Sequence, residues 1–149
     1  MDELAIKKIN PEAIVPTRAT AGSAGYDLYA CLPQQEPIAI PAGGRAAIPT
    51  GIALGIGDAG IAAFVFGRSG LGVRHGIVPA NAVGVVDSDY RGEIVVGLAN
   101  HSDTDFVVHH GDRIAQMVLI PVLTPFLTLC EELDETARGA GGFGSTGQT

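Results

Sequence analysis

Hydrophobic residues occur in short runs that alternate with polar positions or end at glycine and proline. Ile52, Leu54 and Ile56 alternate at every second position, which is the period of a β-strand with one buried face. Short apolar runs separated by turn residues recur at roughly 8–12-residue spacing, which is typical of an all-β sandwich or barrel. The strands predicted in this way are 51–56, 61–66, 93–99, 106–108, 113–120 and 126–130.

Two segments admit a second interpretation. Residues 113–120, RIAQMVLI, have helix propensity, but their length and the bounding Gly111 and Pro121 favour a strand. Residues 131–137, EELDETA, are the best helix candidate, and a polar linker is the alternative.

The composition supports one folded domain with very little helix. The chain has 149 residues, of which 46% are hydrophobic and 17% charged, so it is not a disordered protein. It contains 21 glycines and 9 prolines. Each of these residues costs about 1 or 3 kcal/mol, respectively, inside a helix. We predict a domain over 1–137 and a glycine-rich segment of the same domain over 138–149.

Charge and targeting features narrow the range of partners. A net charge of −7 argues against non-specific binding to nucleic acid or to an anionic membrane. The sequence shows neither a signal peptide at its start nor a membrane-length apolar run, so we predict a cytoplasmic protein. Cys31 and Cys130 are then expected to be buried, reduced thiols. Asn100-His101-Ser102 matches a glycosylation pattern, which has no meaning in a cytoplasmic chain.

Candidate anion chemistry begins with two segments. In AGYDLYA (24–30), Asp27 lies among apolar and aromatic strand residues, so it needs a partner such as an arginine. GRSGLG (67–72) directly follows the predicted strand at 61–66. Arg68 and Ser69 offer two kinds of donor there, and the small residues let backbone N–H groups approach an anion. A simple β-turn is the alternative for this segment.

Two further segments contain polar residues next to predicted turns. GVVDSDYRGE (84–93) is predicted to form a hairpin whose turn covers 89–92. Asp87 and Asp89 would face the same side of a strand, where mutual repulsion raises one pKa and suits a general base. Ordinary turn acids are the alternative. In GDRIAQM (111–117), Arg113 and Gln116 are both compatible with structural roles.

The last segment, RGAGGFGSTGQT (138–149), cannot contribute a core element because it is dominated by glycine. It is either a disordered tail or a segment that closes over a ligand. Its G-x-G-x-x-G pattern is not a dinucleotide fingerprint, because no strand precedes it and no helix follows.

Taken together and in order, these five segments resemble the motifs of the trimeric dUTPase family, the deoxyuridine triphosphate nucleotidohydrolases. The matching segments are 24–30, 67–72, 84–94, 111–119 and 138–147, and the resemblance extends from residue 16 to residue 147. One departure is Gly67, where the family often has proline. The resemblance implies a jelly-roll homotrimer with three active sites, each built from all three subunits.

The implied reaction is hydrolysis of dUTP to dUMP and pyrophosphate with Mg²⁺. It keeps uracil out of DNA and supplies dUMP for thymidylate synthesis. The implied partners are dUTP and two further copies of the chain, with neither nucleic acid nor a membrane. Two alternatives remain open at this stage, namely a dCTP deaminase-like enzyme on the same fold and a non-catalytic nucleotide-binding trimer.

The resemblance also implies roles for individual residues. Asp87 would be the base that activates the attacking water. Asn81 and the backbone of Gly84, Val85, Val86 and Asp87 would bind the uracil edge. Val95 would form a wall of this slot, and Tyr90 would lie under the deoxyribose and exclude a 2′-hydroxyl.

The remaining implied roles concern the triphosphate and the tail. Phosphates would be held by Arg68, Ser69 and Gly70 of a neighbouring subunit, with Gln116 assisting. Mg²⁺ would lie on the triphosphate and waters without a direct protein ligand, and Asp27 would act in its outer sphere. Arg138 would clamp the γ-phosphate, and Phe143, next to Gly144, would stack on the uracil as the tail closes.

Overall fold

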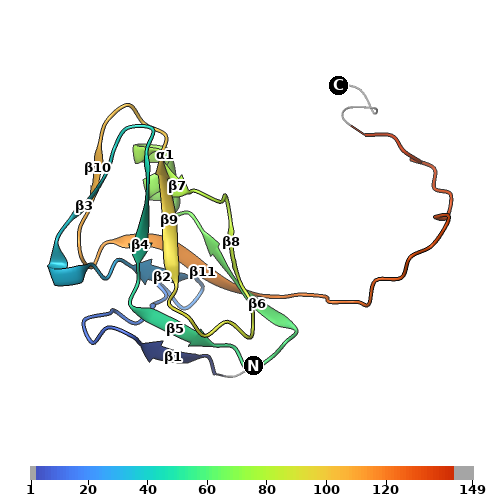
Figure 1. Cartoon of the computed structure of the whole chain (residues 1–149), viewed down its shortest axis with the longest axis horizontal. Helices are drawn as coiled ribbons and strands as arrows, with labels where there is room; N and C mark the ends of the chain where they lie inside the picture. Colours follow the sequence, from blue (N-terminus) through green and yellow to red (C-terminus); the bar gives the residue numbers. More distant parts are fainter. Residues whose placement is uncertain (1–2, 143–149) are drawn as a thin grey trace.

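In the computed structural model, which describes residues 3–142, the chain folds into antiparallel strands around one core (Figure 1). The strands are β1 (Ala5–Lys8), β2 (Tyr26–Tyr29), β3 (Ile38–Ile40), β4 (Arg45–Pro49), β5 (Ile52–Gly55), β6 (Ile61–Phe66), β7 (Ile77–Pro79), β8 (Gly84–Val86), β9 (Val95–Asn100), β10 (Phe106–Val108) and β11 (Arg113–Pro121). Between residues 3 and 142, the helical elements are α1 (Ser69–His75) and the short 3-10 turn η1 (Pro33–Gln35). The predicted all-β, jelly-roll-like fold with very little helix is confirmed.

The strands form two larger sheets and two smaller ones. The larger sheets have the orders β2-β11-β6-β8 and β4-β9-β7, while β1 pairs with β5 and β10 with β3. In Figure 1, β4 and β9 run across the direction of β6 and β11. Inward-facing aliphatic side chains of all four sheets form the core, and the largest of them are Leu28, Leu32, Ile40, Ile48, Ile52, Leu54, Ile77, Leu98, Val108, Ile114 and Met117.

β11 is the central strand that places the site residues. The strand interpretation of its sequence is confirmed, because it pairs with β2 on one side and β6 on the other. It follows Gly111, whose φ of +82° forms the preceding turn, and it ends at Pro121. Within it, Gln116 lies opposite Asp27 of β2 and opposite Phe66 of β6. The segments around 27, 67 and 116 are therefore neighbours.

The segment 67–72 contains the start of α1, so the alternative of a simple β-turn is wrong. Two glycines make this a weak helix sequence, and α1 has only seven residues, none of them buried. The helix ends at His75 and is followed by its C-cap, Gly76, whose φ is +67°. A Cβ at Gly76 would lie 3.1 Å from the Ser102 nitrogen, so both backbone conformation and space favour glycine there.

Asn100 has a structural role instead of being a modification site. Its side chain is 1% exposed. The amide nitrogen donates to the carbonyls of Ile40 and Thr104 at 3.0 and 2.8 Å, and Oδ1 accepts from the backbone and the hydroxyl of Ser102. A fully bonded, buried amide explains an asparagine in an otherwise apolar strand.

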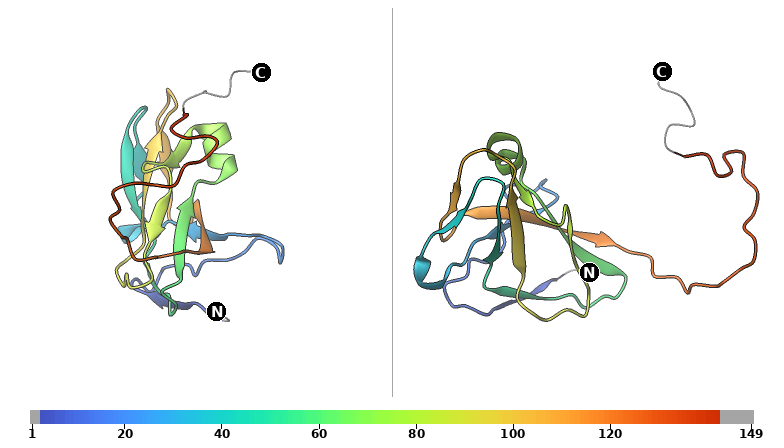
Figure 2. Two further views of the ribbon diagram at one scale, coloured as in Figure 1. Left: turned by 90° about the vertical axis from the view of Figure 1, so that its right-hand side faces the viewer. Right: turned by 45° about the horizontal axis from the view of Figure 1, so that its top comes forward.

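Beyond β11, the chain leaves the body as an extended arm over residues 122–142 (Figures 1 and 2). The predicted strand at 126–130 is wrong: Phe126, Leu127 and Leu129 are 96–103% exposed and pair with no strand between residues 3 and 142. An apolar run forms a strand only where a sheet edge can pair with it and a hydrophobic face can pack on it. The folded body provides neither of these for residues 126–130. Residues 131–137 are a linker, not a helix. Cys31 is buried as predicted, but the predicted burial of Cys130 is wrong, because it lies on this arm.

Candidate functional site

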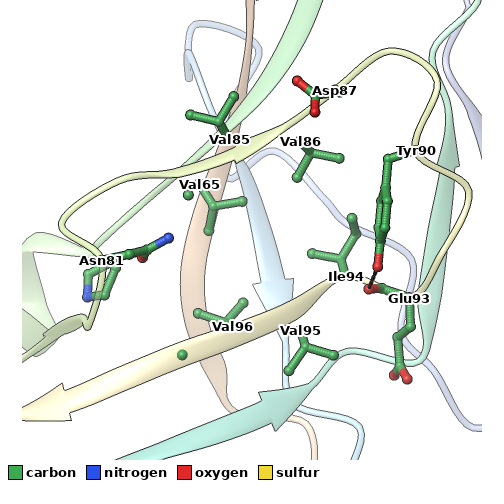
Figure 3. A pocket seen from close by; sticks show the side chains of 13 residues that line it. Val65, Asn81, Val85, Val86, Asp87, Tyr90, Glu93, Ile94, Val95 and Val96 are labelled. Carbon is green, nitrogen blue, oxygen red and sulfur yellow. Dashed lines mark hydrogen bonds between the residues drawn. The ribbon is translucent and has the colours of Figure 1, made fainter.

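A pocket of about 290 Å³ lies between β8 and β9 (Figure 3). The predicted hairpin at 84–93 is wrong in its pairing. β8 bonds to β6, whereas β9 bonds to β4 and β7, so the two strands belong to different sheets and do not form a ladder. The space between them is the pocket. In the described part of the chain β8 pairs with β6 alone, so its other edge has unpaired backbone N–H and C=O groups that are available to a planar polar ligand.

The pocket collects one group of the predicted residues, together with several that the sequence did not indicate. The predicted residues that line it are Asn81, Gly84, Val85, Val86, Asp87, Tyr90 and Val95. The added ones are Val65, Pro79, Glu93, Ile94, Val96 and Gly97. A Cβ on Gly84 would lie 3.2 Å from the Val65 Cβ, so the small residue keeps the slot open against β6.

Asp87 lies just after the end of β8, on the chain between the two strands. The prediction that Asp87 and Asp89 share one face of a strand is wrong, because the strand stops at Val86. In Figure 3, Asp87 and Tyr90 lie on the same connection, and the Tyr90 hydroxyl points away from the Asp87 carboxylate. Within residues 3–142, no side chain or backbone group bonds to the Asp87 carboxylate, which leaves it available to a water.

Tyr90 is positioned by contacts within its own connection. Its hydroxyl donates to the Glu93 carbonyl at 3.1 Å (Figure 3), and its N–H donates to the Asp87 carbonyl at 3.2 Å. A Cβ on Gly92 would overlap the Tyr90 hydroxyl oxygen, so the ring packs directly on the Gly92 backbone.

A second hollow of about 300 Å³ collects the predicted phosphate residues. It is lined by Asp27, Arg68, Ser69, Gly70, Arg113 and Gln116, together with Ala19, Ser23, Ala24 and Gly25. Arg68 follows β6 at the start of α1, and Gln116 of β11 fixes this junction by donating to the Gly67 carbonyl at 2.9 Å.

The sequence predicted an arginine partner for Asp27, and the structure shows two, Arg68 and Arg113. Arg68 Nε lies 2.9 Å from one carboxylate oxygen, and Arg113 Nη1 lies 3.2 Å from the other. The Asp27 side chain is 13% exposed, whereas the arginines are 25% and 50% exposed. Two guanidinium groups on one carboxylate leave a net positive charge that opens to solvent, which suits an anion.

The two groups of predicted residues therefore occupy separate hollows that share no lining residue. Arg138 is in neither of them. It lies exposed on the arm, where its Nε donates to the Gly141 carbonyl at 2.9 Å. Phe143 and Gly144 lie outside the described residues. One chain thus presents two halves of the predicted site, and not one continuous cavity.

Among residues 3–142, no three His, Cys, Asp or Glu side chains come together as a metal site. The carboxylate next to the predicted phosphate residues is Asp27, and both of its oxygens already accept from arginines. Such a carboxylate suits contact with a metal-bound water better than direct ligation. No helix in the described part of the chain is long and apolar enough to cross a membrane.

Sequence reasoning missed Glu93 and Arg113 as residues that shape the site. The Glu93 carboxylate accepts from the Gly51 N–H at 2.7 Å, and Arg113 reaches Asp27. Their partners are distant in sequence, so no local pattern identifies either contact. An acid among apolar and aromatic residues of β2 predicted that some arginine would bind it, but not which one.

Comparison with known proteins is consistent with this geometry. The dUTPase family model matches residues 11–147. A deoxyuridine 5'-triphosphate nucleotidohydrolase of Desulfitobacterium hafniense is 53% identical over 133 residues, covering 89% of this chain and 87% of that protein. One of Hahella chejuensis is 48% identical over 141 residues, covering 95% and 91%. The Staphylococcus bacteriophage 80alpha dUTPase with dUPNHPP has a TM-score of 0.88 at 26% identity, over 99% of this chain and 100% of that one.

Proposed function

The chain belongs to the dUTPase family and is a dUTP diphosphatase, and we propose that Asp87 activates the water that attacks the α-phosphorus of dUTP. The products are dUMP and pyrophosphate. The observation that carries this proposal is the position of Asp87. It stands at one end of the slot with its carboxylate unbonded to other groups of the described chain, so it can orient a water and take its proton.

The slot between β8 and β9 is the proposed base site. The free edge of β8 offers fixed backbone donors and acceptors, and the Asn81 amide stands at one end of the slot. A cytosine edge would leave these groups unpaired, which costs factors of about 10⁴–10⁵ in comparable sites. Val95 and Val86 narrow the slot, so the 5-methyl group of thymine is excluded by contact. Tyr90 lies under the deoxyribose in this proposal.

The hollow with Asp27 and Arg68 is the proposed triphosphate site. Arg68, Ser69 and Gly70 hold phosphate oxygens, with Gln116 keeping their backbone in place. Mg²⁺ suits this hollow, since it binds phosphate oxygens and retains several waters, one of which Asp27 would contact. When bound, Mg²⁺ neutralises charge on the triphosphate. Arg138 and Phe143 of the arm complete the site over the γ-phosphate and the uracil.

A homotrimer explains both the split site and the arm. The arm exposes five large apolar side chains, Leu123, Phe126, Leu127, Leu129 and Leu133, each at least 84% exposed. Contiguous exposed apolar surface of this kind marks an interface. We propose that the arm and the Arg68 hollow of each copy serve neighbouring copies. Light scattering of the purified protein tests this, and a monomer at micromolar concentration contradicts it.

The test of the chemistry is Asp87→Asn, with Asp89→Asn as the matched control in the same connection. Pyrophosphate release from dUTP is measured with and without Mg²⁺. We expect Asp87→Asn to lose about 10²–10⁴-fold in kcat with similar dUTP binding, because general-base catalysis is removed, and Asp89→Asn to remain active. Near-normal turnover by Asp87→Asn overturns the assignment.

Two further measurements distinguish the proposed hydrolase from a deaminase and from a non-catalytic protein. Release of a uracil nucleotide from dCTP would indicate a deaminase, and nucleotide binding without hydrolysis would indicate a non-catalytic trimer. In a cytoplasmic setting, the proposed reaction keeps uracil out of DNA and supplies dUMP for thymidylate synthesis.

A further inference from the structure

The connection that carries Tyr90 has no strand partner on the slot side. Other contacts must therefore fix the position of the Tyr90 ring relative to the slot. β8 ends at Val86 and β9 begins at Val95, and neither bonds to the other. Loops without a ladder are mobile unless other bonds hold them. Tyr90 bonds to the Glu93 carbonyl, so the position of the ring depends on what holds Glu93.

Glu93 is held by the bend between β4 and β5. The Gly51 N–H donates to Glu93 Oε1 at 2.7 Å, a short bond to a charged acceptor across 42 positions of sequence. Gly51 has a φ of +67°, and a Cβ there would lie 2.8 Å from both the Ala13 Cβ and the Cys31 Sγ. The bend is therefore fixed in a left-handed conformation against the core, and it presents its N–H to Glu93 from a rigid base.

The next residue is bound to the same bend. Thr50 is 1% exposed and donates to the Ile94 carbonyl through both its hydroxyl, at 2.6 Å, and its N–H, at 3.2 Å. The Ile94 N–H donates to the Ile52 carbonyl at 2.8 Å. Residues 93–94 are thus held by four hydrogen bonds to residues 50–52. We refer to this set of bonds as the 50–52 clamp.

Glu93 acts on the slot through Tyr90 and not directly. In Figure 3, its carboxylate extends past the Tyr90 hydroxyl, away from Asp87, so it is not placed to act on a reacting group near Asp87. Its backbone carbonyl meets the tyrosine hydroxyl, and its side chain meets the clamp. Glu93 therefore links a rigid part of the core to the ring at the sugar position.

We propose that Glu93 is a positioning residue that sets sugar specificity: by tying residues 93–94 to the 50–52 clamp, it holds the Tyr90 ring where a 2′-hydroxyl cannot fit. This inference rests on the proposed function, in which Tyr90 lies under the deoxyribose. Without the clamp, the ring moves away from the sugar, and ribonucleotides are accepted. Turnover of dUTP should change less than turnover of UTP, because Asp87 is on the other side of the connection.

The test compares Glu93→Ala with Glu93→Gln, which keeps an acceptor for the Gly51 N–H without the charge. Asp105→Ala is the matched control, because the Asp105 carboxylate also accepts from a backbone N–H, that of Ala42, at 3.0 Å and is not among the slot residues. Values of kcat and KM are measured for dUTP and UTP, and Tm is recorded for each variant. Thr50→Val, which removes only the hydroxyl bond to Ile94, serves if Glu93→Ala does not fold.

We expect Glu93→Ala to lower the ratio of kcat/KM for dUTP over UTP about tenfold, the scale of one lost hydrogen bond to a charged group. Glu93→Gln should recover most of the ratio, and Thr50→Val should lower it in the same direction. Asp105→Ala should leave the ratio unchanged even where Tm falls. If Glu93→Ala lowers Tm and leaves the ratio intact, the clamp is purely structural and the inference is wrong.

Binding of the non-hydrolysable imido analogues of dUTP and UTP separates this inference from the proposed function. If the wild-type protein prefers the dUTP analogue and Glu93→Ala loses that preference, the inference holds even if hydrolysis is absent. If the wild-type protein hydrolyses dUTP but binds both analogues equally, the inference fails while the proposed function stands.

Discussion

A single methyl group at Gly92 should relax the sugar specificity of the proposed site without unfolding the protein. A Cβ there would overlap the Tyr90 hydroxyl oxygen and would lie 2.6 Å from the ring carbon that carries it, whereas ordinary contact begins at 3.4 Å. The end of the ring must therefore withdraw by about 1 Å, which makes room for a 2′-hydroxyl at the proposed sugar position. The 3.1 Å bond from Tyr90 to the Glu93 carbonyl would be lost as well.

The stability cost of Gly92→Ala should be small. Gly92 does not have a left-handed φ, so alanine fits the backbone, and the hydroxyl bond that breaks is exposed and contributes about 1 kcal/mol. We expect the ratio of kcat/KM for dUTP over UTP to fall about tenfold while Tm stays within a few degrees. Gly57→Ala is the control, because a Cβ there meets nothing within 4 Å. A dUTP-over-UTP ratio equal to that of the wild type in Gly92→Ala would show that packing on Gly92 does not set the ring position.

Three further predictions concern the core, the buried thiol and the tail. Asn100→Ala should lower the free energy of unfolding by about 2–4 kcal/mol, because the carbonyls of Ile40 and Thr104 lose a buried donor; a urea midpoint equal to that of the wild type would refute this. Burial, reinforced by two nearby carboxylates, raises the pKa of the Cys31 thiol. Its contribution to stability is therefore complete below the unfolded thiol's pKa of about 8.5 and is lost as pH rises through the higher folded value. Cys31→Ala should flatten the fall in Tm above that pH, and parallel curves would contradict the assignment. Removal of residues 138–149 should cut turnover strongly with little change in Tm, since Arg138 is exposed; a large fall in Tm would show a structural role instead.

Periodicity and turn residues predicted most of the strands because those strands bury one face within a single chain. Residues 61–66 and 113–120 are strands at nearly the predicted bounds. The failure at 126–130 has the opposite cause. Phe126 and its neighbours are as apolar as a core strand, but no edge of the chain's own body receives them. The sequence pattern predicts that a segment will be buried, but it does not indicate whether the same chain or another molecule covers that segment.

The candidate site was predictable where the motif residues themselves line a hollow. Asp27, Arg68 and Gln116 meet in one hollow as the motifs suggested. The hairpin at 84–93 was mispredicted because strand pairing depends on competition among edges. β8 pairs with β6, and β9 pairs with β4 and β7, so β8 and β9 do not pair with each other. Glu93 looked like the end of a turn, and only the folded chain brings it to Gly51.

The arrangement of strands gives a direct test of whether two copies build one site. Asp27 lies on β2 and the slot on β8, which are the opposite outer strands of the β2-β11-β6-β8 sheet. Three strand spacings separate them, about 14 Å, and the two edges face different directions. One nucleotide would have to straddle the sheet to use both halves of the same copy, whereas rotational symmetry brings unlike edges of neighbouring copies together.

Mixed trimers distinguish these two arrangements. Asp87→Asn and Arg68→Ala should each be inactive alone, because each lacks one half of the site. When the two are unfolded together in equal amounts and refolded, a shared site pairs an intact Asp87 with an intact Arg68 in about a quarter of cases for random association. We therefore expect about a quarter of wild-type dUTP turnover to return after co-refolding, and none after mixing of the separately folded variants. Co-refolded material that stays inactive, although native mass spectrometry shows mixed trimers, would place both halves of the site in one chain.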